Sequence, residues 1–534
     1  MHQRWMWWLR AAVLVLALCS MGWLTVGTGG TFASPDENAN AFFARTLANA
    51  GTFCAPEPLN VLAEGLIHPR STVGPGTCVL PSTFLGFPAV TGFVQFLFGD
   101  VGMFLVTPII AIAAVMSFWW LVRRMTDNDR LADIAALLLL SHPAFWYYSA
   151  RVMMHNVAFV GSLIIGIALF IRSHQKSSVF LAAVSGAVAA VGLSMRLVEA
   201  PIFFVIATII VVVYRRSLPW KILGAAACGG AFILGFYLII NHQIYGSAFA
   251  TGYNLPDVRI ESTVASEGGA TIVDRISALL LPFGFHPRAI LRNVLQYGFS
   301  LYPLTSILAI VGAIVAWRST THRKMWRTLV VCLVVAAAWM GVVYGSWSMA
   351  DNTDPRAVTV GNSHVRYWLP LFAAASILVP LGITNIARHF FKDLRAGRIV
   401  LAVSLLVVLA LNARIVFGGS DGLLATRAAL HTFVEKREIL LEITEDDAVI
   451  VVDRADKYLF PSRRVIVPLR SESTYAIMPT LAPIVPLYYF GITLPDADVM
   501  YLNQKKLSPL GLEIVHVQTI QEESLYRIQL PVAR

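Results

Sequence analysis

Apolar stretches of about 17–25 residues recur along the first 417 positions, separated by polar connections. A helix of that length crosses the hydrocarbon core of a bilayer, and helix is required because backbone groups in lipid must be satisfied within their own segment. The pattern therefore predicts an all-α polytopic membrane protein with about eleven transmembrane helices. The predicted spans cover residues 7–27, 101–122, 131–149, 153–171, 179–197, 200–214, 222–241, 299–317, 328–347, 366–384 and 399–417.

Basic residues gather in alternate connections, which fixes the predicted orientation. These connections hold about 18 Lys and Arg residues, whereas the short loops between them hold one or two each. Cytoplasmic loops carry such an excess, so we predict a cytoplasmic N-terminus in the plasma (inner) membrane. Arg4, Arg10 and Thr31-Phe32-Ala33 also fit a cleavable signal peptide, but the long apolar run favours an uncleaved first helix. The basic residues are Arg4 and Arg10; Arg123, Arg124 and Arg130; Arg172 and Lys176; Arg215, Arg216 and Lys221; Arg318, Arg323, Lys324 and Arg327; and Arg388, Lys392, Arg395 and Arg398.

Most of the remaining polar sequence is predicted to face outward. Residues 1–417 form the predicted transmembrane domain, with outward loops over 28–92, 242–298 and 348–365. Residues 418–534 contain short β-branched runs at 448–453 and 464–468 and amphipathic stretches near 423–444 and 474–486. This tail is predicted to be a small extracytoplasmic α/β domain.

Composition agrees with a membrane protein and narrows the choice of partners. The chain is 57% hydrophobic and 13% charged, against roughly 45–50% and 25% in soluble domains. The formal charge of +10 follows the cytoplasmic loops, so the lipid bilayer and not nucleic acid is the predicted partner. Cys54 and Cys78 lie in the first outward loop, where a disulfide and two free thiols are both compatible with the sequence. No Cys/His spacing is typical of zinc, and no metal or other cofactor is supported.

Asp36 and Glu37 open the first outward loop, just before a predicted helix over 39–50. Ser34 or Asp36 can cap that helix, with Pro35 near its first turn. One interpretation is that the acidic pair only complements the positive end of the helix. The other is that a carboxylate just outside the first span acts as a catalytic base, with only one of the two adjacent residues acting directly.

Several short motifs carry a family resemblance. They are the Asp36-Glu37 pair after a short first helix, Tyr148-Ser149-Ala150-Arg151, Tyr245-Gly246-Ser247 with Thr251-Gly252-Tyr253, and Arg366-Tyr367-Trp368-Leu369-Pro370. With these motifs and its topology the chain resembles the C-type glycosyltransferase superfamily, in particular the branch of protein O-mannosyltransferases and lipid A aminoarabinose transferases. The resemblance covers roughly residues 1–417. It departs from the family at Met153-Met154-His155-Asn156, where relatives often carry a second acidic residue.

The resemblance implies transfer of a sugar from a polyprenyl-phosphate-linked donor to an acceptor hydroxyl, with a glycan, lipid or protein as acceptor. A glycosidase uses two carboxylates because its leaving group must be protonated. Polyprenyl phosphate already leaves readily, so one base and phosphate-binding cations suffice. Asp36 is the expected general base and Glu37 a supporting group, and attack opposite the phosphate would invert the anomeric centre.

The phosphate ligands should be cations at the outer ends of the spans. The candidates are Arg151, Arg196, Arg366, His155 and His242, followed by His286, Arg288 and His364. Tyr245, Tyr253 and Tyr367 are the substrate-binding residues that the resemblance implies. Each arginine also fits a simpler interpretation as an anchor at the membrane interface.

Two other functional classes remain as alternatives. A polytopic transporter or lipid-linked-sugar flippase would move its substrate without covalent change, but the internal symmetry of such folds is not evident here. A non-catalytic scaffold would use the C-terminal domain for docking and would leave Asp36-Glu37 and the outer arginines unexplained.

Overall fold

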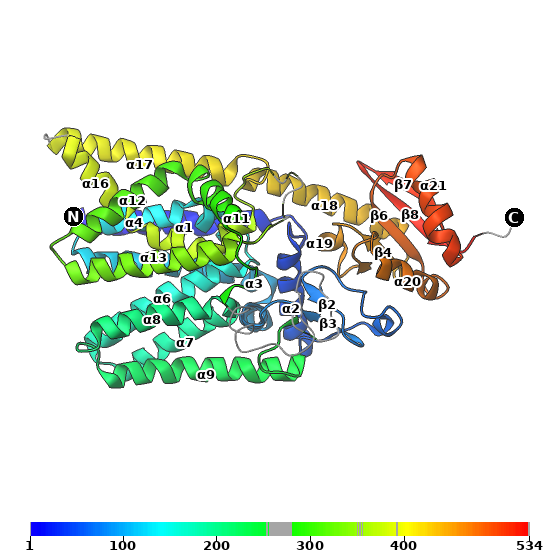
Figure 1. The fold of residues 1–534 in the computed structure, drawn as a ribbon, viewed down its shortest axis with the longest axis horizontal. Coiled ribbons are helices and arrows are strands. Elements are labelled where there is room, and N and C mark those ends of the chain that lie inside the picture. Colours follow the sequence, from blue (N-terminus) through cyan, green and yellow to red (C-terminus); the bar gives the residue numbers. More distant parts are fainter. Residues whose placement is uncertain are drawn as a thin grey trace. The chain divides into compact units, whose positions relative to one another are not determined.

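The computed structural model describes residues 2–252, 255, 280–349, 351, 354, 356–390 and 394–531. The structure is mostly helical, at about 68%. The chain divides into two compact units, one formed by residues 1–24, 105–236 and 263–426, and the other by 25–104, 237–262 and 427–534. Figure 1 shows the fold of the chain, with most of its helices and strands labelled.

The first unit is helical. Its helices are α1 (His2–Gly22), α4 (Asp129–Ser141), α5 (Pro143–Ala150), α6 (His155–Lys176), α7 (Val179–Met195), α8 (Ala200–Tyr214), α11 (Pro287–Asn293), α12 (Pro303–Arg318), α13 (Arg323–Gly345), α14 (Ser363–Tyr367), α15 (Leu369–Ala375), α16 (Val379–Phe390) and α17 (Leu394–Phe417). Helices α3 (Gly86–Thr126), α9 (Trp220–Tyr245) and α18 (Leu423–Ile443) have residues in both units.

All eleven predicted spans are helical, but not all are single long helices. Among the described residues, eight helices are long and apolar enough to cross a membrane, or nine if a pair bent by 96° counts as one span. That pair joins Pro287–Ser300 to Pro303–Arg318. The span predicted over 131–149 is broken at His142, because Pro143 has no N–H to continue the helix. Helix α7, at 17 residues, is at the lower limit of the length that crosses a bilayer. The chain is an integral membrane protein of the predicted fold class.

Small residues let helices of the first unit approach closely. A Cβ built on Gly186 of α7 would lie 1.8 Å from the carbonyl oxygen of Ala226 in α9, and one on Gly229 would lie 2.0 Å from that of Ala183. Neither space holds even a methyl group. This is the packing expected in lipid, where backbone contact between helices replaces the hydrophobic effect as the source of association.

The outward loop predicted over 28–92 is folded. It holds helix α2 (Pro35–Ala50) and an antiparallel sheet of order β1-β3-β2, with β1 at Ala55–Pro56, β2 at Thr72–Val73 and β3 at Cys78–Pro81. Cys54 and Cys78 form a disulfide at the β1–β3 edge, which resolves the alternative left by the sequence.

The C-terminal tail forms a five-stranded mixed sheet of order β5-β4-β6-β8-β7. Its strands are β4 (Val449–Val452), β5 (Arg464–Ile466), β6 (Leu487–Ile492), β7 (Glu513–Ile520) and β8 (Glu523–Gln529), joined by helices that include α19 (Asp456–Leu459), α20 (Glu472–Leu481) and α21 (Asp496–Tyr501). Strands β5, β4 and β6 are parallel, and β8 and β7 are antiparallel. The predicted α/β character of the tail and its first two strands, β4 and β5, are therefore present. Figure 1 labels β4, β6, β7 and β8 of this sheet.

Both faces of this sheet are covered. Val449 and Val451 pack in one apolar cluster with Met478 of α20, while Ile450 and Val452 pack in another with Leu440 of α18. Successive side chains of a strand point to opposite faces, so the four-residue apolar run of β4 supplies both cores.

The loop over 28–92 and the tail pack together within the second unit. Ile67 forms an antiparallel bridge with Ile466 of β5, and Ala63 and Ile67 belong to the same core as Val449. Arg464 of β5 donates from Nε to both carboxylate oxygens of Glu57, at 3.1 and 3.0 Å. Two segments about 400 positions apart in sequence thus share one folded unit.

Candidate functional site

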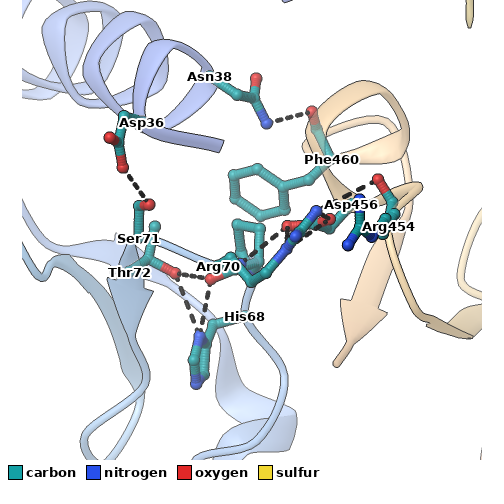
Figure 2. Close-up of polar contacts among 10 residues, drawn as sticks. Asp36, Asn38, His68, Arg70, Ser71, Thr72, Arg454, Asp456 and Phe460 are labelled. Atoms are coloured by element: carbon teal, nitrogen blue, oxygen red, sulfur yellow. Dashed lines mark hydrogen bonds and ion pairs between the residues drawn. The ribbon is translucent and has the colours of Figure 1, made fainter. Parts of the chain in front are cut away.

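Asp36 lies in the first turn of α2, and its position follows from the local sequence. Ser34 caps the helix by accepting a hydrogen bond from the Glu37 N–H at 3.3 Å, and Pro35 occupies the first turn. Both features were predicted. Asp36 is half-buried, and its Oδ1 accepts a 2.5 Å hydrogen bond from the Ser71 hydroxyl, as Figure 2 shows. Its carboxylate is therefore held in one orientation by a partner outside its own helix.

The Ser71 turn is itself anchored to the C-terminal tail. Arg70 donates to the fully buried carboxylate of Asp456 from its backbone N–H at 3.0 Å and from Nη2 at 2.6 Å. From α2, the Asn38 side-chain amide donates to the Phe460 carbonyl at 3.2 Å. Figure 2 shows these contacts beside the Asp36–Ser71 pair. The orientation of Asp36 thus depends on residues of the loop and of the tail together.

Glu37 differs from its neighbour in burial. Its exposed fraction is 3%, whereas Asp36 is half-buried. The adjacent side chains project differently from the helix, as the sequence predicts, so Asp36 is the more accessible of the two carboxylates.

The predicted arginines of the first unit lie where helices are interrupted. Arg151 follows α5 and precedes α6, and Arg196 ends α7 before the short 3₁₀ turn η3 (Leu197–Glu199) that leads into α8. Arg366 lies in the five-residue helix α14. Arg151 and Arg196 are 6% and 5% exposed. Their burial argues against the simpler interpretation that they are snorkelling anchors, since an anchor extends its charge into water.

Arg196 is the centre of a buried polar network. Its Nη2 donates to Glu199 Oε1 at 2.9 Å and to the Tyr344 hydroxyl at 3.0 Å, and Tyr344 in turn donates to the same Glu199 oxygen at 2.6 Å. On the other side, Nη1 lies 3.4 Å from Nε2 of His155. The guanidinium also lies 4.5 Å from the centre of the Tyr367 ring, a cation–π distance.

The same ring joins Arg366 to this network. The Arg366 guanidinium lies 5.1 Å from the Tyr367 ring centre, and its Nη1 contacts the sulfur of Met154 at 3.5 Å. The Met154 N–H donates to the Arg151 carbonyl at 2.8 Å, and Arg151 Nη1 donates to the Tyr147 hydroxyl at 3.1 Å. The structure therefore brings His155, Arg196, Arg366 and Tyr367 into one cluster, with Arg151 at its edge.

The other predicted residues lie elsewhere or outside the described residues. In the second unit, the buried Tyr245 donates its hydroxyl to the Pro81 carbonyl at 2.7 Å, and His242 is exposed at the end of α9. In the first unit, His286 and Arg288 are exposed near the start of α11, and His364 is buried against the Tyr297 ring. Tyr253 lies outside the described residues.

Glu199 and Tyr344 also belong to this network, although neither was predicted from the sequence. Glu199 is completely buried, and both side chains bind Arg196 directly. The spacing of Arg196 and Glu199, three residues apart at a junction between two apolar segments, was a usable signal, because charged residues at membrane depth are costly and pair with one another. Tyr344 had no signal, since it lies in an apolar helix far along the chain.

No group of three or more His, Cys, Asp or Glu side chains within the described part of the chain is arranged to hold a metal ion. The polar groups gathered in the first unit are mainly guanidinium groups, which carry only hydrogen-bond donors and suit anions, and tyrosine hydroxyls, which can donate and accept.

Comparison with known proteins connects this architecture to solved structures. No protein-family model and no curated protein matches the sequence. The structure of ArnT from Cupriavidus metallidurans bound to undecaprenyl phosphate aligns over 97% of both chains, with a TM-score of 0.53 and 13% identity. Its apo form aligns over 99% of this chain and 98% of that one, with the same TM-score and identity. An oligosaccharyltransferase from Archaeoglobus fulgidus aligns over 90% of this chain and 69% of its own, with a TM-score of 0.49 and 12% identity.

The alignment with ArnT, a lipid A aminoarabinose transferase, runs along nearly the whole of both chains. The protein therefore has the fold of the C-type glycosyltransferases, and the resemblance that the short motifs indicated is confirmed at the level of the fold.

Proposed function

We propose that the protein is a membrane glycosyltransferase that moves a sugar from a polyprenyl-phosphate-linked donor to an acceptor hydroxyl on the extracytoplasmic side of the plasma membrane. The observation that carries the proposal is the shared fold, over 97% of both chains, with ArnT, whose structure holds undecaprenyl phosphate. The buried arginine cluster supports it, because a guanidinium suits the planar, bidentate recognition of a phosphate.

In the proposed reaction Asp36 is the general base. Its carboxylate accepts the proton of the acceptor hydroxyl as that oxygen attacks the anomeric carbon of the sugar. A bond forms between the acceptor oxygen and the anomeric carbon, and the bond from that carbon to the phosphate oxygen breaks. The electron pair leaves with polyprenyl phosphate, so no general acid is needed, and attack opposite the phosphate inverts the anomeric centre.

The arginine cluster would stabilise the charge of the departing phosphate. Glu199 and Tyr344 hold one edge of the Arg196 guanidinium, and the Tyr367 ring lies against its face. A guanidinium that is already oriented stabilises the charge that develops in the transition state more strongly than a mobile one does. His155, beside Nη1 of Arg196, is a further candidate donor to the phosphate.

Replacement of Asp36 tests the base directly. Asp36→Asn keeps the size of the side chain and can still accept the Ser71 hydrogen bond, but its amide cannot take up a proton. We expect sugar release from a purified polyprenyl-phosphate donor to fall by at least about 100-fold, in a variant that inserts and folds normally. Ser71→Ala is the matched control, since it removes the hydrogen bond and leaves the base, and it should cost much less.

Turnover near that of the wild type in Asp36→Asn would remove Asp36 as the base. Equal losses in Asp36→Asn and Ser71→Ala would instead assign Asp36 a purely structural part in holding the Ser71 turn. Movement of an intact lipid-linked sugar across proteoliposomes, without any covalent change, would favour the transporter or flippase.

A further inference from the structure

The C-terminal domain contains a pocket that the proposed chemistry does not use. It has a volume of about 290 Å³ and lies within the second unit. Two basic side chains, two acidic side chains and two tyrosines form its polar lining. They are Arg470, Lys506, Glu472, Asp498, Tyr475 and Tyr501. A concave site with a few converging polar groups on a partly apolar wall is the usual form of a binding site for a small molecule.

The topology of the sheet gives this pocket a definite position. Strand β4 lies between β5 and β6, and these three strands are parallel, so the chain moves to one side of β4 and then to the other. Leu469 and Arg470, which follow β5, and Leu494, which follows β6, line the pocket. In open α/β sheets, ligands bind outside the carboxyl ends of parallel strands, where the strand order reverses in this way.

The tyrosines form the wall and the charged groups surround them. Tyr475 is 8% exposed, whereas Tyr501 is 55% exposed. The Lys506 ammonium lies 5.6 Å from the centre of the Tyr475 ring and pairs with Glu472 at 2.8 Å. Burial raises the pKa of the Tyr475 hydroxyl, and Lys506, Glu472, Arg470 and Tyr501 all act on it electrostatically. Lys506 and Glu472 therefore form a charge pair beside the Tyr475 ring, in the lining of the same pocket.

Arg470 and Asp498 leave hydrogen-bonding capacity in the lining of the pocket. Both are exposed, and within the described ranges neither side chain makes a hydrogen bond or an ion pair. A guanidinium offers only donors and a carboxylate only acceptors, while a tyrosine hydroxyl offers both. The formal charges of the four ionised side chains cancel. This lining suits a neutral ligand that needs donors and acceptors together beside a ring face.

We propose that this pocket binds a saccharide unit. Each sugar hydroxyl donates and accepts, and neighbouring hydroxyls match the paired atoms of a carboxylate or a guanidinium, as in other bidentate contacts. The C–H face of a sugar ring would lie on the exposed Tyr501 ring, which is large, rigid and amphipathic. A free phosphate fits less well because two carboxylates share the pocket.

This inference deepens the proposed function. It rests on that function in one respect, because it identifies the bound saccharide as part of the acceptor of the transferase. The acceptor of the transferase would then be a glycan, recognised in part by the C-terminal domain. Binding of a saccharide to the pocket is a separate statement and can be measured without turnover.

The experiment uses the full chain in detergent. Fluorescently labelled protein is applied to an array of immobilised oligosaccharides, and the Kd of the sugar retained most strongly is then measured by titration. We expect Tyr501→Ala to weaken that sugar by about fivefold to tenfold, because it removes the stacking ring. Asp498→Asn should weaken it because an amide nitrogen replaces an acceptor oxygen. Asp496→Asn, on the same helix and absent from the pocket lining, should bind like the wild type.

Retention of no oligosaccharide by the wild type would overturn the proposal, as would equal binding by Tyr501→Ala, Asp498→Asn and the wild type. Tighter binding of inorganic phosphate than of any sugar in a competition titration would also overturn it. The Asp36→Asn variant separates the two proposals. It should bind the sugar normally, and if it also turns over normally, the proposed catalytic base fails while the saccharide pocket stands.

Discussion

At the scale of single residues, the pair formed by Arg196 and Glu199 is a buried charge pair whose two members depend on each other. Glu199 is completely buried and accepts from both Arg196 and Tyr344. Removing one partner of such a pair leaves an uncompensated charge in a medium of low dielectric constant. The network is therefore expected to carry stability as well as the proposed function.

Glu199→Gln tests this dependence. We expect the free energy of unfolding to fall by roughly 3 kcal/mol, because the amide keeps the shape of the side chain but leaves the Arg196 charge unpaired. Thermal unfolding in detergent measures the effect. Glu438→Gln, an exposed change in α18, is the control and should leave the midpoint unchanged. Equal midpoints for the two variants would contradict the assignment.

His364 predicts a loss of stability in acid. Its side chain is buried, and its Nδ1 lies 2.9 Å from the Asn362 side-chain oxygen. Burial lowers the pKa of His364 to about 4. The unfolded chain takes up this proton near pH 6.5, but the folded protein does so only near pH 4, so stability is full above pH 6.5 and falls as the pH drops toward 4.

We expect this single group to cost roughly 3 kcal/mol between pH 7 and pH 4. The measurement compares how the free energy of unfolding depends on pH in the wild type and in His364→Gln. The glutamine cannot titrate, so the variant should lack the part of the acid-induced loss of stability that comes from His364. His431→Gln, an exposed control, should keep it. Parallel curves for the wild type and His364→Gln would show that the residue is not the source.

Several residues of the candidate site were predictable because a charged residue at the end of an apolar span has few structural roles. Arg151, Arg196 and Arg366 are cations on the side of the membrane that is predicted to face outward, where the short loops hold few others. The capping of α2 by Ser34 follows from the preference of serine for the N-cap position. Tyr344, the Ser71 partner of Asp36 and the Asp456 anchor of Arg70 were not predictable. Each depends on tertiary contacts between distant segments, which hydrophobic periodicity does not encode.

At the scale of helices, the close approach of α7 and α9 depends on two glycines. Gly229→Ala would bring a methyl group to 2.0 Å from the Ala183 carbonyl oxygen. We expect the backbones to separate and the protein to lose roughly 1–3 kcal/mol, the usual cost of overpacking. Gly224 lies in the same helix with nothing near its Cβ position, so Gly224→Ala should be neutral or slightly stabilising. Comparison of the two unfolding midpoints tests this, and a similar loss in both would refute the packing argument.

The lengths of the apolar runs predicted where helices occur, but not where they break. Pro143 explains the interruption after α4, and the 96° bend before α12 comes just ahead of Pro303. Proline marked both positions in the sequence, yet a proline is also tolerated inside α3 at Pro108. Whether a proline breaks a helix depends on neighbouring helices that can satisfy the freed carbonyl, which the sequence of one segment does not reveal.

At the scale of the whole molecule, the charge pattern predicts sidedness, and labelling measures it. Cys19, Cys228 and Cys332 are first replaced by Ser, which leaves the Cys54–Cys78 disulfide. In that background Ala497→Cys should react with a membrane-impermeant thiol reagent on intact cells or spheroplasts, because the C-terminal domain is predicted to face outward. Thr320→Cys, in a basic loop, should react only after the membrane is opened. The reverse pattern would invert the proposed topology.

The contact between Arg70 and Asp456 has a practical consequence for shortened versions of this protein. Within the described contacts, the Arg70 side chain has two partners, the Asp456 carboxylate and the Arg454 carbonyl. A chain cut after the last apolar helix would lose both. The neighbouring Ser71 turn would then lose this anchor, and the Asp36 carboxylate that Ser71 orients would become mobile. An inactive truncation would thus say nothing about what the tail itself recognises, and substitutions at the tail's own surface are the informative route.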